Sequence, residues 1–384
     1  MLILLCILAI NDVHNEMKPA KPMKLNLIHE LTIGENSEDE NQVFTVGTRL
    51  TVDDKGSMYI MDPGNFRVAV FDKKGNFVRS FGAQGEGPGE FKQLKEIRFQ
   101  PDGKLAVYDL GHKKVNRFNP DGTFASELAF PRQLVGIAAP VYLENGNLMV
   151  SVIRIDDVGT NHFELNLYDE NFKQIKNILT MPQPPKDWSQ SRNPEFWVKF
   201  LTDIFEGMEK GLPLTTMIDS KHFVGLRSNV YKASIYDQDG NRVGGFDKKN
   251  KPKPFTPDAK AAAYEETWSI MTNNAFLANN LPRTTFDKAL AKADVGDVIR
   301  PIWAITTFGD KIGILANYNS AKRSGDLDLF DSKGHFIATT EYKGSSQFLY
   351  GHGNHLYTTD EDEDGNMVVM RYRLEGLGNK QTDH

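Results

Sequence analysis

The sequence predicts an all-β fold, a six-bladed β-propeller, and three observations lead to it. A segment with four alternating apolar stretches recurs along the chain, a short turn signature marks each copy, and one N-terminal strand has no copy of its own. A repeat that reads as four short strands is typical of one propeller blade, which buries its two faces only against neighbouring blades.

The first two copies show the repeat most clearly. The stretch LTVDDKGSMYIMDPGNFRVAVFDKKGNFVRSFG (50–82) aligns with IRFQPDGKLAVYDLGHKKVNRFNPDGTFASELAF (97–130). Turn residues such as D-K-G and P-D-G separate the apolar stretches, as hairpins require. Three pairs of positions match at one offset: Asp62 with Asp109, Phe71 with Phe118, and Gly75 with Gly122.

A turn signature at the end of the third strand counts the blades. An aromatic residue is followed four positions later by glycine, which reaches the positive φ of a tight hairpin without strain. Five copies and one degenerate copy predict six blades: Phe71–Gly75, Phe118–Gly122, Tyr236–Gly240, Phe330–Gly334, Tyr372–Gly376, and Tyr168 with Phe172 in place of the glycine.

The last copy lacks a fourth strand of adequate length after Leu377. The stretch from Leu25 to Ile33 (LNLIHELTI) is a predicted strand that precedes the first blade. We expect it to close the ring as the outer strand of the last blade, because a closed ring leaves no unpaired edge.

Two motifs in the first blade resemble those of NHL-repeat propellers. FGAQGEGPGEF (81–91) resembles their glycine-rich connector, and DPGNFRVAVFD (62–72) resembles their D-x-x-N-x-R-[IV]-x-x-F signature, from which the second blade departs in loop spacing. The resemblance covers about residues 50–130. It implies the fold, whereas the family's functions include binding modules, bacterial surface lipoproteins and some lyases.

Two segments do not fit the blade pattern, about 181–214 and about 246–300. Asn193-Pro194-Glu195 predicts a helix start before FWVKFLTDIFEGMEK, with a stop at Gly211. Thr256-Pro257-Asp258 opens a second helix, and Thr285 to Ala293 predicts a shorter one. Both insertions join the last strand of one blade to the first strand of the next, so we expect them on one face, above the central channel.

Trp197 and Trp268 lie in these insertions among other aromatic residues. One interpretation is an aromatic lid over a ligand pocket, because aromatic side chains offer large, rigid contact areas. The alternative is that they hold the helices on the propeller, because any surface helix needs an apolar stripe to pack against the rest of the protein.

Polar residues end the second strands on the same face. A ligand-binding ring there would consist of Asp62, Asp109, Arg227, Asn317 and Asp360, with Arg154 nearby in the third blade. The alternative, strongest for the two aspartates, is that they cap the following loops by accepting backbone N–H groups.

One loop resembles a calcium site. Asp360, Asp362 and Asp364 have the 1, 3, 5 carboxylate spacing, and Gly365 follows at position 6. Val368 stands at position 9, the closing Glu is missing, and MVVMRY predicts a strand, so an acidic hairpin loop is the default. The histidines fall in no metal-binding spacing: His112, His162, His222, His352 and His355.

The N-terminus resembles an export signal. MLILLCILAI (1–10) is apolar but too short to span a bilayer, and it lacks a basic start and an A-x-A cleavage site. Cys6 is the one cysteine of the chain. One interpretation is that it carries a lipid, which would be the sole membrane attachment expected. The alternative is that it is an apolar residue of the signal core. We expect a signal-like segment (1–20), one propeller domain (21–377) and a tail (378–384).

Charge and motifs narrow the function. The net charge of −6 without a basic stripe argues against nucleic acid, and no catalytic motif is present. The sequence therefore favours an exported binding module, periplasmic, cell-surface or outer-membrane-anchored, for a peptide, glycan or protein. The alternative is a lactonase-like metal-dependent hydrolase or lyase with a divalent ion in the channel.

Overall fold

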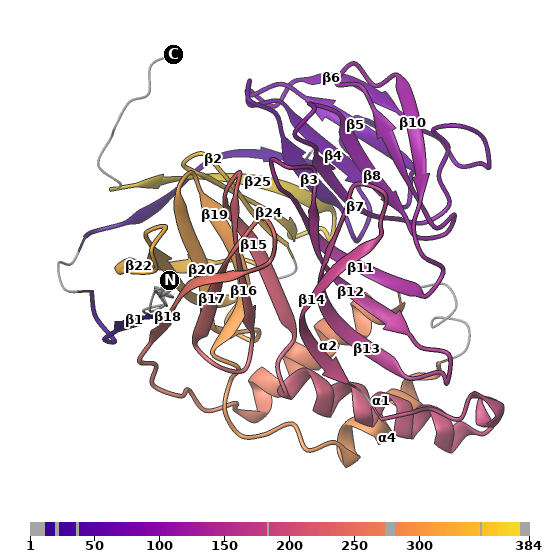
Figure 1. Ribbon diagram of the computed structural model, residues 1–384, viewed down its shortest axis with the longest axis vertical. Helices are drawn as coiled ribbons and strands as arrows, with labels where there is room; N and C mark the ends of the chain where they lie inside the picture. Colours follow the sequence, from indigo (N-terminus) through magenta and orange to yellow (C-terminus); the bar gives the residue numbers. More distant parts are fainter. Residues whose placement is uncertain are drawn as a thin grey trace, which may run out of the picture.

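The computed structural model describes residues 12–19, 23–35, 38–182, 184–272, 281–345 and 348–376. They form six sheets arranged as the blades of a propeller (Figure 1). The predicted signal core with Cys6 and the predicted tail lie outside the described residues.

The first three blades are four-stranded sheets in simple sequential order. Blade 1 consists of β3 (Arg49–Val52), β4 (Met58–Asp62), β5 (Arg67–Phe71) and β6 (Phe77–Phe81). Blade 2 consists of β7 (Leu94–Phe99), β8 (Leu105–Asp109), β9 (Lys114–Phe118) and β10 (Phe124–Ala129). Blade 3 consists of β11 (Leu134–Tyr142), β12 (Leu148–Ile155), β13 (Asn161–Tyr168) and β14 (Gln174–Pro182).

The other three blades include the two N-terminal strands. Blade 4 consists of β15 (Pro213–Asp219), β16 (His222–Arg227), β17 (Lys232–Asp237), β18 (Arg242–Lys248) and β1 (Asp12–Asn15). Blade 5 consists of β19 (Ile302–Phe308), β20 (Lys311–Asn319), β21 (Ser324–Phe330) and β22 (Phe336–Lys343). Blade 6 consists of β23 (Leu349–His352), β24 (His355–Glu361), β25 (Met367–Glu375) and β2 (Asn26–Ile33).

Alternation along the strands builds the core between blades. In blade 1, Leu50 and Ile60 pack toward Tyr357 of blade 6, whereas Tyr59 and Met61 pack toward the apolar residues of blade 2. Successive side chains of a strand point to opposite faces, so each blade shares one apolar layer with each neighbour.

Strand β2 confirms the predicted closure of the ring. It pairs antiparallel with β25, with Asn26 opposite Glu375 and Ile33 opposite Val369. Strand β1 was not predicted. It pairs parallel with β18 and extends blade 4 to five strands, although the sequence assigned residues 1–20 to a signal-like segment.

The turn signature also has the predicted geometry. Gly75, Gly122, Gly240 and Gly334 all adopt positive φ in the turns after the third strands. In the degenerate copy Phe172 takes the same left-handed conformation with a φ of 59°. This conformation is strained for an aromatic residue, and Phe172 is held there by burial among Tyr108, Phe130 and Tyr168.

The insertions are helical and lie together on one side of the propeller (Figure 1). They contain α1 (Pro194–Glu209), α2 (Pro257–Thr272) and α4 (Arg283–Lys292), with a short 3₁₀ turn, η1 (Trp188–Gln190), before α1. Asn193 caps α1 through a bond from the Glu195 amide, as its sequence predicted. Within the ranges described, no helix is both long and apolar enough to cross a membrane.

Candidate functional site

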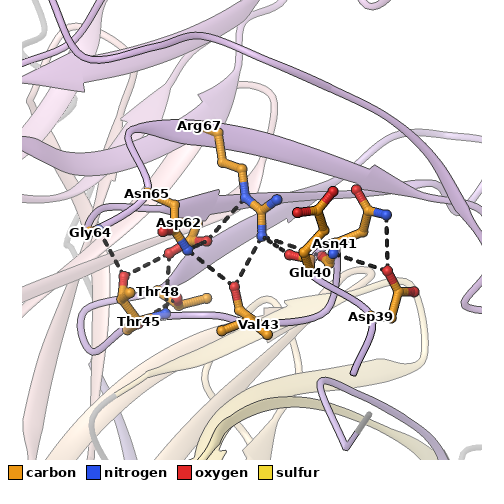
Figure 2. A network of polar contacts seen from close by, with 10 residues as sticks. All are labelled: Asp39, Glu40, Asn41, Val43, Thr45, Thr48, Asp62, Gly64, Asn65 and Arg67. Atoms are coloured by element: carbon orange, nitrogen blue, oxygen red, sulfur yellow. Dashed lines mark hydrogen bonds and ion pairs between the residues drawn. The ribbon is translucent and has the colours of Figure 1, made fainter. Parts of the chain in front are cut away.

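Asp62 ends β4 on the face that carries the helices, as the sequence predicted, but its carboxylate is fully engaged. Figure 2 shows it accepting bonds from the amide and the hydroxyl of Thr45, at 3.1 and 2.6 Å, from Asn65 at 2.7 Å and from Arg67 at 3.2 Å. The side chain is completely buried. Asp62 therefore fastens the connector before β3 to the loop after β4.

Asp109 and Asp360 repeat this arrangement in other blades. Asp109 accepts the amides of Lys92 and Gln93 at 2.9 and 2.8 Å, from the connector before β7. Asp360 accepts the amide of Ser345 at 3.0 Å, from the connector before β23, and pairs with Arg323. We call these three carboxylates, Asp62, Asp109 and Asp360, the connector clasps. They fit the capping interpretation.

The other members of the predicted polar ring also have local partners. Arg154 forms a bidentate pair with Glu164, with its closest contact at 2.7 Å. Arg227 donates to the carbonyl oxygen of Thr180 at 2.9 Å. Asn317 adopts a φ of 52° and bonds to Asn250 and Asp326. The structure places these residues at the strand ends without bringing them together around one point.

Trp197 and Trp268 belong to an apolar cluster that joins the helices. Trp197 packs against Phe196 and Phe200 of α1 and donates its indole N–H to the carbonyl of Ser191 at 2.8 Å. Trp268 packs edge-on against Phe286 of α4, with ring centres 5.0 Å apart. These contacts hold α1, α2 and α4 together, in agreement with the packing interpretation.

The acidic loop after β24 has the geometry of a hairpin turn, which was the default interpretation of its sequence. Asp362 accepts the amides of Asp364 and Asn366 at 3.0 and 2.8 Å, so it caps the turn. Asp360 faces away from them, toward Arg323. In the part of the chain that the structure describes, no three His, Cys, Asp or Glu side chains are grouped as metal ligands would be.

Four of the five histidines singled out above each lie beside a carboxylate. His112 contacts Asp109 and Glu86, and the others contact one acidic residue each: His162 with Asp156, His222 with Asp219, and His355 with Glu30. His352 instead stacks on Tyr350. His112, His162 and His222 thus lie in three different blades, and His352 and His355 share blade 6, each with its own partner rather than around a common ion.

A pocket of about 200 Å³ lies where α1 and α2 meet blade 5. Its walls are largely aromatic and aliphatic, and its polar side chains are few. The lining residues are Phe205, Met208, Glu209, Phe255, Ala263, Tyr264, Glu266, Thr267, Arg300 and Trp303. We call this the helix pocket.

Arg300 supplies the positive charge of the helix pocket. Its guanidinium lies 4.6 Å over the ring of Trp303. Among the described residues it has neither a hydrogen bond nor an ion pair, and burial lowers its pKa. A half-buried guanidinium without hydrogen-bonding partners among the described residues keeps its donors available, so it is the group in this pocket best suited to bind an anion.

Glu209 and Tyr264 face the same pocket. Burial raises the pKa of the Glu209 carboxyl group, although Arg300 and Lys260 oppose the shift. Burial also raises the pKa of the Tyr264 hydroxyl, and Glu209 adds to that shift. Both groups are therefore held toward their neutral, hydrogen-bond-donating forms.

The sequence did not identify Arg300, Glu209 or Trp303 as site residues. Arg300 is the last residue of the second predicted insertion, and Glu209 is one acidic residue of a helix. Trp303 lies just beyond that insertion, at a β-bulge between the pairs Ile302–Ala316 and Ala304–Leu315. A bulge turns an additional side chain out of the ladder. The usable signal was a tryptophan at the start of a strand directly after the insertion.

Comparisons with known proteins agree with the fold. Residues 36–192 match a family model described as a 6-bladed beta-propeller. A candidate exported protein of Bacteroides fragilis NCTC 9343 is 13% identical, with a TM-score of 0.55 over 94% of this chain and 99% of that chain. A member of the duf4221 family from Bacteroides vulgatus ATCC 8482 is 10% identical, with a TM-score of 0.52 over 93% and 100%. No curated protein matches the sequence.

Virginiamycin B lyase from Staphylococcus aureus is more remote. It is 12% identical, with a TM-score of 0.44 over 92% of this chain and 99% of that chain. A similarity this low does not extend to the chemistry of the lyase. The family model and the two Bacteroides structures confirm the predicted six-bladed β-propeller, with which the NHL-like motifs are consistent.

Proposed function

We propose that this propeller is an extracytoplasmic binding module that recognises an acidic peptide or protein segment in the helix pocket. The observation that carries the proposal is Arg300, a half-buried residue whose guanidinium lies on Trp303 and has no ion pair among the described residues. Charge-assisted bonds to a carboxylate are among the strongest that a side chain forms.

The size of the pocket favours insertion of one side chain. Its volume of about 200 Å³ is below the ~300–1,000 Å³ of sites that enclose a drug-sized molecule. Phe205, Phe255 and Tyr264 supply apolar walls around the guanidinium. An acidic residue beside an aromatic or aliphatic one matches both features. Glu209 and Glu266 line the same pocket and act on Arg300 through their charges, but neither is ion-paired with it, so a neutral glycan would leave the guanidinium without a charge-assisted bond.

The location outside the cytoplasm is part of the same proposal. It is supported by the apolar N-terminal stretch of the sequence and by the description of the Bacteroides fragilis relative as a candidate exported protein. Attachment through a lipidated Cys6 would place the propeller at a membrane surface, and the periplasm and the cell surface are the other two locations. Metabolic labelling with an alkyne-tagged fatty acid, compared between the wild type and Cys6→Ser, tests the attachment.

The metal-dependent hydrolase or lyase is the second function that the sequence allowed. It needs three or four side chains converging on one ion. The described histidines and carboxylates form separate pairs instead, and no specific observation in them favours catalysis. Binding is therefore the function that the geometry supports best.

The test is a selection of short peptides on the immobilised full-length chain. We expect enrichment of peptides with Asp or Glu beside an aromatic residue, and Arg300→Met should weaken their binding about tenfold or more. Arg283→Met is the matched control, because Arg283 also lies over a tryptophan, Trp268 at 5.5 Å, but is ion-paired to Glu265 and Asp287.

Binding of the selected peptides is then measured by fluorescence anisotropy for each variant. Equal affinity for the wild type and Arg300→Met would exclude the helix pocket as the site. Selection of neutral or basic peptides would exclude the proposed ligand class. A circular-dichroism melt of each variant confirms that the fold is intact.

A further inference from the structure

The innermost strands of blades 1, 2 and 6 bring a second group of cations together. The first strands of successive blades contact one another around the ring, so their side chains line the central channel. Arg49 lies on β3, and Lys95, Glu96 and Arg98 lie on β7. Arg98 lies 5.3 Å over the ring of Tyr350 of β23, so its side chain reaches from blade 2 to blade 6.

Lys95 is directed away from its own ladder by a β-bulge. Leu94 pairs with Asp109 and Glu96 with Tyr108, so Lys95 is the additional residue between them. A bulge re-aims a side chain at the cost of regular pairing. The corresponding residue of β19 is Trp303, which lines the helix pocket.

The charges in this cluster do not balance. Among the residues that the structure describes, Glu96 is the one carboxylate that forms ion pairs with this cluster, and it is buried. Its oxygens lie 3.9 Å from Arg49 Nε and 3.4 Å from a terminal nitrogen of Arg98. Lys95 has no hydrogen bond or ion pair of its ammonium group among the described residues. Three cations therefore face one anion.

Burial makes this excess charge unfavourable. It lowers the pKa of Lys95, and the charge of Arg49 lowers it further, while Glu96 opposes both effects. Burial likewise lowers the pKa of Arg49. The charge of Glu96 opposes this shift, and the charge of Arg98 adds to it. Beyond Glu96, Arg49 donates to the carbonyl oxygen of Thr48 at 3.3 Å and lies over Phe348 at 5.2 Å, and Arg98 donates to the carbonyl oxygen of Ile97 at 2.7 Å. These partners do not balance the positive charge. Like charges that share a partly buried site repel, and a bound anion would remove that repulsion.

We propose that the channel cluster, Arg49, Lys95, Glu96 and Arg98, binds a compact oxyanion, a site separate from the helix pocket. Lys95 supplies an ammonium group with three free donors, and the two arginines supply planar guanidinium groups. Phosphate, sulfate and small carboxylates share the required chemistry. The proposal is independent of peptide recognition, because its residues lie on β3 and β7 rather than on α1, α2 and β19.

Isothermal titration calorimetry of the full-length chain with sulfate, phosphate and acetate, at constant ionic strength, tests this site. Sulfate also stabilises proteins by exclusion from their surface, so heat of binding is the primary measurement. We expect saturable binding of one anion, weakened about tenfold or more in Lys95→Met. Lys95→Arg keeps the charge and should retain binding.

Lys92→Met is the matched control, because Lys92 precedes the same strand but is exposed and pairs with Glu86 at 3.3 Å. It should bind anions like the wild type. Lys95→Glu should balance the cluster, abolish anion binding and raise the melting temperature at low ionic strength. Absence of saturable binding in the wild type, or equal affinity in Lys95→Met, overturns the proposal. The relative affinities of the three anions distinguish a tetrahedral from a planar ligand.

Discussion

Lys248 of β18 donates to Asp328 of β21 over 2.6 Å, and both side chains are buried. The pair joins blade 4 to blade 5, and the hydroxyl of Tyr231 donates to the same carboxylate. The ammonium group also lies 4.5 Å over the ring of Phe336. A buried carboxylate with two donors is stable only while both remain, so this pair makes the interface between two blades sensitive to one residue.

Lys248→Met should lower the free energy of unfolding by about 3–5 kcal/mol, because it leaves the Asp328 charge buried with Tyr231 alone. Methionine keeps most of the packing against Phe336, so the loss reports the charge. Denaturant titration followed by tryptophan fluorescence measures it. Lys249→Met is the control, since Lys249 pairs with Glu16 in the open, with side chains 68% and 72% exposed. Equal losses in both variants would contradict the prediction.

Asp109→Ala should destabilise the fold by about 2 kcal/mol or more, because the buried amides of Lys92 and Gln93 lose their acceptor. The measurement is the urea dependence of the circular-dichroism signal. Glu127→Ala removes a half-exposed carboxylate that pairs with Lys114 and should cost less than about 1 kcal/mol. If Asp109→Ala left stability unchanged, its clasp function would be excluded and a ligand-binding function would gain support.

The parts of the fold set by local patterns were predictable from the sequence. Turn glycines, strand alternation and the unpaired strand at Leu25–Ile33 predicted six blades and their closure, and the Asn193 cap predicted α1. The helix pocket was not predictable in this way. Glu209 lies on α1, 94 residues before Trp303 of β19, and Arg300 lies in the connector just before that strand. Only the packing of α1 and α2 on blade 5 brings Glu209 to the other two.

The predicted polar ring shows the opposite case, in which a clear sequence pattern reflects a structural contact rather than a binding site. Repeated positions such as Asp62 and Asp109 are easily found because blades 1, 2 and 6 use the same clasp between their connectors and their second strands. A structural requirement that recurs in several blades produces a sequence signal as clear as that of a binding site. The unrepeated residue Arg300 gives no such signal, although it has no ion pair within the described ranges, which makes it the better candidate.

Glu209 should make stability depend on pH. Its folded-state pKa is raised by burial, so the native state retains a proton that the unfolded chain releases. Its contribution to stability is complete below the ordinary pKa of Glu and is lost as the pH rises through the raised value. The stability of the wild type relative to Glu209→Gln should therefore fall with rising pH across that window, as thermal melts at a series of pH values would show.

Glu206→Gln is the control for this pH dependence, because Glu206 lies on the same helix one turn earlier and is not among the residues that line the helix pocket. Its difference from the wild type should stay level over the same window. A level difference for Glu209→Gln as well would mean that the carboxyl group is already ionised in the helix pocket. It would then compete with a bound peptide carboxylate for Arg300.

Asn15 of β1 should control access to the outer edge of blade 4. Its amide group donates to the carbonyls of Asp247 and Gly334, and its carbonyl accepts the amide of Phe336, all at 2.9 Å. Asn15→Ala removes the three bonds at once, which we expect to cost about 1–3 kcal/mol. Without β1, strand β18 becomes a free edge open to pairing with another chain.

Hydrogen exchange in Asn15→Ala should therefore accelerate in peptides that cover β18 and the start of β22, and light scattering should detect self-association. His14→Ala, which alters a side chain 74% exposed, should change neither, and similar behaviour of the two variants would show that Asn15 does not hold β1 in place.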